Sequence, residues 1–150
     1  MNTNRKSVSH YEERYTRYFH DPINRFTCIY CGVHHGITMD HVPPISRVPD
    51  YEALDLQRPL YIKVPACKQC NSLLGNTLQC DILERIQVAK DLLRRKLAKD
   101  LRCALEAADV EEMGPTLRAV MESAIESRDL AEARLEYWDG FQYLLDELSL

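Results

Sequence analysis

Two Cys-x-x-Cys pairs constrain the fold of this chain more than any other feature of its sequence. The first pair is Cys28 and Cys31, and the second is Cys67 and Cys70. Two pairs with this spacing, each on a tight turn, present four soft thiolates with little backbone strain, which is the ligand set that tetrahedral zinc prefers. We therefore predict a structural zinc site made of these four cysteines.

The separation of the two pairs is also informative. They are 35 residues apart, whereas a compact zinc ribbon has about 15–20 residues there. The excess indicates an insertion with a function of its own. His34 or His35 could replace one cysteine as a ligand, but four thiolates already complete the tetrahedral shell. Two further cysteines have no such partner, and we expect them to be small packing residues: Cys80 and Cys103.

Length and composition fit one compact domain, or a small module with a helical extension. The chain has 150 residues, of which 45% are hydrophobic, enough for one compact domain. It has no apolar run of about 18 residues or more, so we expect no membrane span. The N-terminus lacks the apolar stretch of a secretory signal. We therefore expect a cytoplasmic, reducing location, where paired cysteines are more often metal ligands than disulfides.

Charge is distributed unevenly along the chain. The net charge is −4, with +2 in residues 1–76, +3 in residues 77–104 and −9 in residues 105–150. The first two segments are mildly basic and the last is strongly acidic. The overall balance neither establishes nor excludes a nucleic-acid partner. We expect the acidic segment to pack against the basic one, to dimerise or to contact a partner protein.

The first 25 residues are expected to form an N-terminal helical arm. Ser9 and Glu12 have the spacing of a capping box, which predicts a short helix that runs to about Phe19. Three aromatic residues recur on one face of this helix: Tyr11, Tyr15 and Tyr18. This stripe either packs on the neighbouring module or stacks on nucleic-acid bases.

Residues 26–76 contain both cysteine pairs and little regular helix. We expect short strands at 37–39 and 60–64, because both stretches are rich in β-branched and aromatic residues. The four prolines between them predict a loop over 43–59. A helical turn is expected to begin at Asn71.

Residues 77–150 have the apolar spacing of helices. The pattern predicts a helix of about 25 residues from Thr77, and Pro115 is well placed in the first turn of a second one. The two stripes should pack together as an antiparallel hairpin, or between two copies of the chain. The first part, 77–104, is basic, and the remainder, 105–150, is acidic.

A polar constellation lies between and just after the cysteine pairs. Asp40 and His41 are adjacent, and Asn71 follows Cys70 directly. A neutral imidazole can accept a proton from water near neutral pH. Carboxylate and amide oxygens are hard donors that suit Mg²⁺ or Mn²⁺. These three residues therefore have the chemistry needed to hydrolyse a phosphodiester bond.

The segments 28–32, 38–44 and 64–71 together resemble the zinc-knuckle branch of the HNH endonucleases. The resemblance covers about residues 26–76 and implies a ββα-metal core of two strands and a helix. It also implies that His41 is the general base, that Asp40 and Asn71 bind a catalytic Mg²⁺ or Mn²⁺, and that the four cysteines hold zinc. The middle Asn of the family pattern is not matched, because Leu60 occupies the corresponding position.

The sequence thus predicts an α+β protein with a zinc-braced core, an N-terminal arm and a C-terminal helical hairpin. We expect a metal-dependent endonuclease that cleaves DNA. Four flanking cations are candidates for contacts to phosphate: Arg47, Arg58, Lys63 and Lys68. The alternative is a non-catalytic zinc module that binds nucleic acid or protein. The C-terminal helices are expected to form a homodimer or to bind a protein partner.

Overall fold

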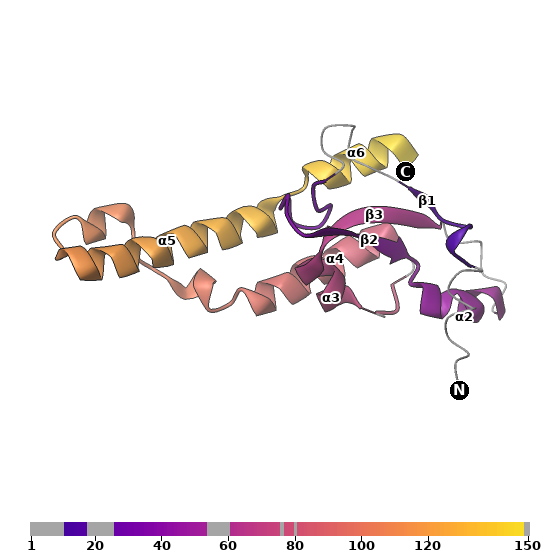
Figure 1. Ribbon diagram of the computed structural model, residues 1–150, viewed down its shortest axis with the longest axis horizontal. Helices are drawn as coiled ribbons and strands as arrows, with labels where there is room; N and C mark the ends of the chain where they lie inside the picture. The colour runs from indigo at the N-terminus through magenta and orange to yellow at the C-terminus, as the bar shows by residue number, and fades with distance from the viewer. Residues whose placement is uncertain (1–10, 18–25, 54–60, 76, 80, 149–150) are drawn as a thin grey trace.

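The computed structural model describes residues 11–17, 26–53, 61–75, 77–79 and 81–148. A small sheet and the helices packed on it form the body of the molecule, and one long helix extends away from the body (Figure 1). The mixed α+β class expected from the sequence is confirmed. Within the described residues, no helix has both the length and the apolar character that crossing a membrane requires.

Three strands form the sheet in the order β1-β3-β2. Strands β2 (Ile37–Val42) and β3 (Ile62–Cys67) are antiparallel, with His41 opposite Lys63. All six residues of β3 are buried, because β3 is the central strand and is covered on both faces. Strand β2 lies at the edge of the sheet.

The short strand β1 (Thr16–Arg17) pairs in parallel with β3 and was not expected. The prediction of a helix running to Phe19 is therefore wrong. Helical residues end at Glu12, and the Thr16 N–H donates to the Tyr61 carbonyl at 2.9 Å. The edge of β3 offers backbone partners that a helix could not use. Tyr18 and Phe19 lie outside the described residues.

The stretch predicted to be a loop is partly helical. A 3-10 turn, η1 (Ile45–Arg47), leads into the short helix α2 (Val48–Ala53). Pro49 does not prevent this helix, because the first turn of a helix has no internal partner for a backbone N–H. Residues 54–60, with Arg58 and Leu60, lie outside the described part of the chain.

Helix α3 (Lys68–Leu74) follows β3 directly and ends at Gly75, which has a φ of 46°. Helix α4 (Ile82–Lys96) begins after Asp81, whose carboxylate accepts from the backbone of Leu83 and Glu84. This N-cap explains why α4 starts later than Thr77. The helix has 15 residues, which is shorter than predicted.

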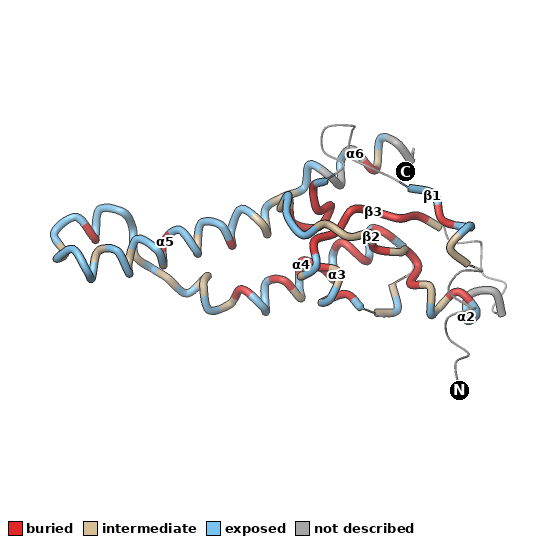
Figure 2. The backbone as a smooth tube through the Cα atoms, viewed as in Figure 1, coloured by how far each residue is buried: buried red, intermediate tan, exposed pale blue. Residues whose placement is uncertain are grey.

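Two 3-10 turns, η2 (Asp100–Arg102) and η3 (Ala107–Val110), connect α4 to the long helix α5 (Pro115–Glu136). The outer part of α5 packs on these turns, so the predicted hairpin of two long helices forms only in part. A last helix, α6 (Asp139–Leu148), returns to the sheet. Figure 2 shows that buried residues gather around β3, α3 and α4, whereas the outer part of α5 is mostly exposed.

Candidate functional site

The four paired cysteines meet at one buried point, as the sequence predicted. Their sulfur atoms all lie within 4.8 Å of one another, and the Sγ atoms of Cys31 and Cys67 are 3.8 Å apart. A tetrahedral zinc with Zn–S bonds of about 2.3 Å places its sulfur ligands about 3.8 Å apart. Both the donor chemistry and the spacing therefore fit a metal ion such as zinc.

Local backbone structure explains how each pair is presented. We call the turn that carries Cys28 and Cys31 the first knuckle, and the turn that carries Cys67 and Cys70 the second knuckle. In the first knuckle, the Gly32 N–H donates to the Cys28 carbonyl at 2.9 Å, and Gly32 has a φ of +74° that favours glycine. In the second knuckle, Cys67 is both the end of β3 and the N-cap of α3, and its sulfur accepts from the Cys70 N–H at 3.4 Å. The Ile29 N–H donates to Pro65 of β3 and ties the knuckles together.

Hydrogen bonds within the cluster favour the thiolate form of two cysteines. A hydrogen bond with Cys28 lowers the pKa of Cys67 to about 6, and the same donor lowers the pKa of Cys31. Metal binding displaces the protons that remain on a cluster of thiols.

Neither neighbouring histidine joins the cluster in the described structure. His34 and His35 are exposed, and the His34 Nδ1 is 2.9 Å from the Thr27 hydroxyl. Cys103 is half-buried at a distance from the four sulfurs. Cys80 lies outside the described residues. Among the described residues, the four cysteines are the one group of three or more His, Cys, Asp or Glu side chains close enough together to hold a metal.

Asp40 lies in β2 and is held by a buried arginine. Arg85 of α4 donates to Asp40 Oδ2 from Nε at 2.7 Å and to Oδ1 from Nη2 at 2.8 Å. The Tyr30 hydroxyl also donates to Oδ2, at 2.5 Å. Arg85 is fully buried, and Asp40 is 4% exposed. Both oxygens that a divalent cation would need are therefore engaged by neighbouring side chains.

The pKa values of Arg85 and Tyr30, the two residues that donate to Asp40, are consistent with a tight ion pair. Burial lowers the pKa of Arg85, but the hydrogen bonds to Asp40 outweigh it, so the pKa is raised. Burial, together with the charge of Asp40, raises the pKa of Tyr30 well above its usual value. Both residues therefore keep their protons at all relevant pH values and donate to the carboxylate.

Asn71 lies in the first turns of α3 and contacts the same strand. Its Nδ2 donates to the Thr38 hydroxyl at 2.9 Å and to the Met39 carbonyl at 3.4 Å. A carbonyl can only accept, so these contacts assign the amide orientation. Thr38 and Asp40 are two residues apart on a strand and share one face. Asn71 is thus on the same side of β2 as Asp40.

His41 projects from the opposite face of β2, since adjacent strand residues alternate. Its Nε2 is 2.8 Å from Glu12 Oε2, and its ring meets Tyr15 edge-on with 4.8 Å between centroids. Glu12 also binds the ammonium of Lys63. The hydrogen bond from Lys63 is the largest cause that lowers the pKa of Glu12, ahead of its interactions with His41.

The structure therefore brings Asp40 and Asn71 to one face and places His41 on the other. Lys63, expected to contact phosphate from the surface, is instead 7% exposed and paired with Glu12. Arg47 pairs with Asp50 at 3.2 Å, and Lys68 is exposed at the start of α3. Arg58 lies outside the described residues.

Two of the most informative residues, Arg85 and Lys90, were not singled out from the sequence. In the sequence they are two of the cations of the basic segment 77–104. Both nevertheless fall on the apolar stripe of α4, close to Ile82, Ile86 and Leu93. A cation inside an apolar stripe signals a buried partner, since unpaired buried charges are costly. Glu12 gave no comparable signal, because its contact with His41 spans 29 positions.

Comparison with known proteins gives no relative on which to base an assignment: no protein-family model matches the chain, and neither a curated protein nor a solved structure matches it.

Proposed function

We propose that this protein is a divalent-metal-dependent endonuclease of the HNH type that hydrolyses DNA phosphodiester bonds. One observation carries the proposal. Helix α3 begins at the cysteine cluster and holds Asn71 against β2, on the face of the strand that also bears Asp40. A carboxylate and an amide beside one strand are suitable oxygen donors for Mg²⁺ or Mn²⁺.

Each residue has a distinct role in this proposal. The four cysteines hold a structural zinc, which fixes α3 at the end of β3. Asp40 and Asn71 hold the catalytic cation. Among the described contacts, the hydrogen bonds of Asn71 are made by its Nδ2. Its Oδ1 is therefore the atom that would bind the cation. A bound Mg²⁺ would stabilise the charge that develops on the phosphate. His41 accepts the proton of the attacking water.

The proposal places two demands on the site. The cation has to replace or share the contacts of Arg85 with Asp40. The substrate phosphate also has to be reached by His41 from the other face of β2. Strand β2 is the terminal strand of the described sheet, and a ligand at its edge could be approached by side chains from both faces.

Exposed cations offer contacts to the DNA backbone. Lys68 lies beside Asn71 at the start of α3. Further exposed cations follow one another at the end of α4 and just beyond it: Arg94, Arg95, Lys96, Lys99 and Arg102. Such cations release counterions from DNA, so the affinity should fall steeply with salt concentration.

A second candidate function is favoured by a specific observation. The bidentate pair of Arg85 with Asp40 supplies the positive charge that a catalytic cation would bring. A chain in which this pair is permanent would be a non-catalytic zinc module that binds nucleic acid. Asp40 would then be a structural residue, and His41 a partner of Glu12.

Plasmid cleavage separates the two candidates. Purified, zinc-loaded protein is incubated with supercoiled DNA and Mg²⁺ or Mn²⁺, and nicked and linear products are quantified. The endonuclease proposal predicts metal-dependent nicking that falls by at least about 100-fold in His41→Ala and in Asn71→Ala. His35→Ala is the matched control, because His35 is exposed near the cysteines and is expected to be unaffected.

The opposite result is equally informative. Retention of DNA in a gel-shift measurement, with no nicking by the wild type under any divalent cation, supports the non-catalytic module. Nicking that persists unchanged in folded His41→Ala contradicts the assignment of the base. Zinc content and the circular-dichroism spectrum of each variant establish that the fold is intact.

A further inference from the structure

The C-terminal turn of α5, which contains Arg134 and is called the inner end of the helix below, is connected to the cysteine cluster by that arginine. Arg134 Nη2 lies 3.5 Å from Cys31 Sγ and donates to Gln69 Oε1 at 2.7 Å. Gln69 stands between the two cysteines of the second knuckle. One guanidinium group on α5 therefore reaches the first knuckle through a sulfur and the second through an amide.

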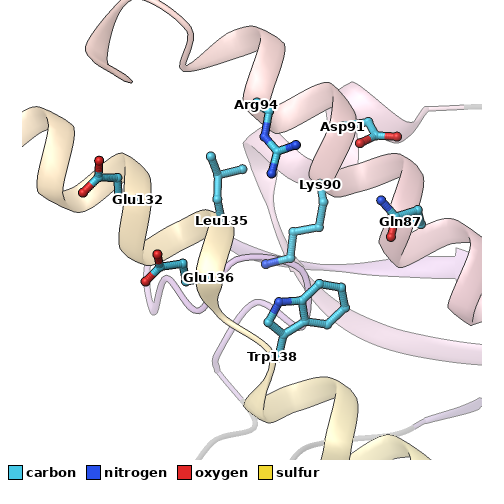
Figure 3. A pocket seen from close by; sticks show the side chains of 8 residues that line it. All are labelled: Gln87, Lys90, Asp91, Arg94, Glu132, Leu135, Glu136 and Trp138. Carbon is cyan, nitrogen blue, oxygen red and sulfur yellow. The ribbon is translucent and has the colours of Figure 1, made fainter. Parts of the chain in front are cut away.

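A second cation strengthens the same junction from α4. The Lys90 ammonium donates to the carbonyls of Arg134 at 3.0 Å and Tyr137 at 2.6 Å. Carbonyls at the end of a helix have no partner within the helix, so Lys90 satisfies them. Figure 3 shows Lys90 extending from α4 toward the Trp138 ring, and its Nζ is 5.2 Å from the ring centroid.

Neither of these two cations forms an ion pair with a carboxylate in the described part of the chain. Lys90 is 4% exposed, and the Nε of Arg134 is buried with no hydrogen-bond partner among the described residues. Burying a cation without an opposing charge is costly. The cysteine cluster, which Arg134 contacts through Cys31, is one source of such a charge.

A zinc ion bound by four thiolates carries a net charge of about −2. Groups outside the first ligand shell that donate to metal-bound sulfur orient the ligands and increase metal affinity. Arg134, which contacts Cys31 Sγ and Gln69 of the second knuckle, therefore has the position of a charged donor outside the ligand shell of a zinc bound there.

We propose that Arg134 is a positioning residue of the cysteine centre: it docks the inner end of α5 on the zinc knuckles and strengthens metal binding, so that bound metal in turn favours the docked arrangement. The inference requires metal binding by the four cysteines and is independent of any hydrolytic activity. Loss of zinc would release the inner turns of α5 and the following helix α6 from the core. The packing of α5 and α6 on the core would thus depend on whether the cysteine site holds a metal.

Two measurements on the full chain test this inference. Zinc affinity is measured by competition with a chromophoric chelator, and backbone hydrogen exchange is followed over residues 131–148 with and without zinc. We expect Arg134→Met to weaken zinc binding by about 10–100-fold. We also expect exchange at the inner end of α5 to accelerate in the wild type after chelation, and in zinc-loaded Arg134→Met without chelation.

Arg128→Met is the matched control. Arg128 lies on the same helix but donates to the carbonyls of Cys103 and Leu105, away from the sulfurs. It should leave the zinc affinity unchanged. Arg134→Lys, which keeps the charge and loses the planar fork, should give an intermediate affinity and provides a second variant if Arg134→Met does not fold.

Each result bears on the inference. Equal zinc affinities of Arg134→Met and wild type, with exchange over 131–148 insensitive to metal, overturn it. A wild type that binds no zinc overturns both this inference and the structural-zinc part of the proposed function. Absence of DNA cleavage by a zinc-loaded wild type leaves it standing, so the two proposals fail separately.

Discussion

Arg85 donates two hydrogen bonds to the carboxylate of Asp40, at 2.7 Å from Nε and 2.8 Å from Nη2. The arginine also donates to the Thr77 hydroxyl at 2.9 Å and to the Gly75 carbonyl at 3.3 Å. The pair thus joins β2 to α4 and to the turn after α3. A residue expected to bind a catalytic metal is also an anchor of the fold.

Removal of one partner of this pair should be strongly destabilising. Arg85→Met leaves the carboxylate of Asp40 buried without a counter-charge, and we expect a loss of about 3–5 kcal/mol in the free energy of unfolding. The measurement is urea-induced unfolding of the zinc-loaded protein followed by circular dichroism. Arg95→Met, at an exposed position of the same helix, is the control and should change stability by less than about 0.5 kcal/mol.

The double variant Asp40→Asn with Arg85→Met completes the cycle. It buries no unpaired charge, so its stability should recover by at least about 1 kcal/mol relative to Arg85→Met alone. Additive losses in the double variant would show that the two side chains do not interact in solution. The cycle reports on the structural role of Asp40 independently of any cleavage assay.

Each of the four clustered cysteines should be required for metal binding. Serine at Cys28, Cys31, Cys67 or Cys70 replaces a soft thiolate by a poor zinc ligand. We expect one zinc per chain in the wild type and a loss of at least about 100-fold in zinc affinity in each variant. Elemental analysis and chelator competition provide the measurements.

Cys103→Ser is the control for this series, because Cys103 is half-buried outside the cluster. It should keep the zinc content of the wild type. Equal zinc loss in Cys103→Ser and in the clustered variants would indicate a general effect of thiol removal and would contradict the four-cysteine assignment.

The pair of Glu12 with Lys63 should make a small, pH-dependent contribution to stability. The pKa of Glu12 is lowered in the folded state, chiefly by the hydrogen bond from Lys63. A lowered folded-state pKa gives stability that is present above the unfolded value of about 4.5 and is lost as the pH falls through the folded value. The side chain of Glu12 is 41% exposed, so we expect no more than about 1 kcal/mol.

Glu12→Gln tests this dependence. The variant should be less stable than the wild type at pH 7, and the difference should shrink toward zero as the pH falls from 4.5 through the lower pKa of folded Glu12. Glu13→Gln is the neighbouring control, since Glu13 is exposed. A difference between Glu12→Gln and wild type that stays constant from pH 7 to pH 3 would rule out the carboxylate as its cause.

Local patterns predicted much of the metal-binding core. The spacing of Cys28 and Cys31 and of Cys67 and Cys70 is a short-range signal, because each pair lies on one turn whose geometry the neighbouring residues determine. The strand that carries Asp40 was also found, although it extends to Val42 rather than ending at Met39. The helical turn expected at Asn71 is part of α3, which begins three residues earlier.

Contacts between distant parts of the chain could not be predicted from such patterns. Strand β1 depends on a partner 46 positions away, Ile62 for Thr16, and no local feature of residues 16–17 indicates that pairing. The prediction of a helix over these residues was wrong, because the capping box of Ser9 and Glu12 concerns only the turn that precedes them. Burial of Lys63 and Arg85 likewise depends on Glu12 and Asp40, which approach them only in the folded chain.

Gly32 offers a final test of how the first knuckle meets the end of α5. Its φ is +74°, and a Cβ at this position would lie 2.7–2.8 Å from the ring of Tyr137. Gly32→Ala therefore combines backbone strain with a clash against an aromatic side chain, and we expect a loss of about 1–3 kcal/mol in unfolding free energy.

Gly36→Ala is the matched control, because its φ is +61° but a Cβ there meets only the flexible side chain of Lys68 at 3.9 Å. It should show the backbone part alone, about 1 kcal/mol. In a Tyr137→Ala background the clash is absent, so Gly32→Ala should cost no more than Gly36→Ala. Urea unfolding of the zinc-loaded proteins measures all three differences. An equal cost of Gly32→Ala with and without the Tyr137 ring would mean that the inner end of α5 does not rest on the knuckle.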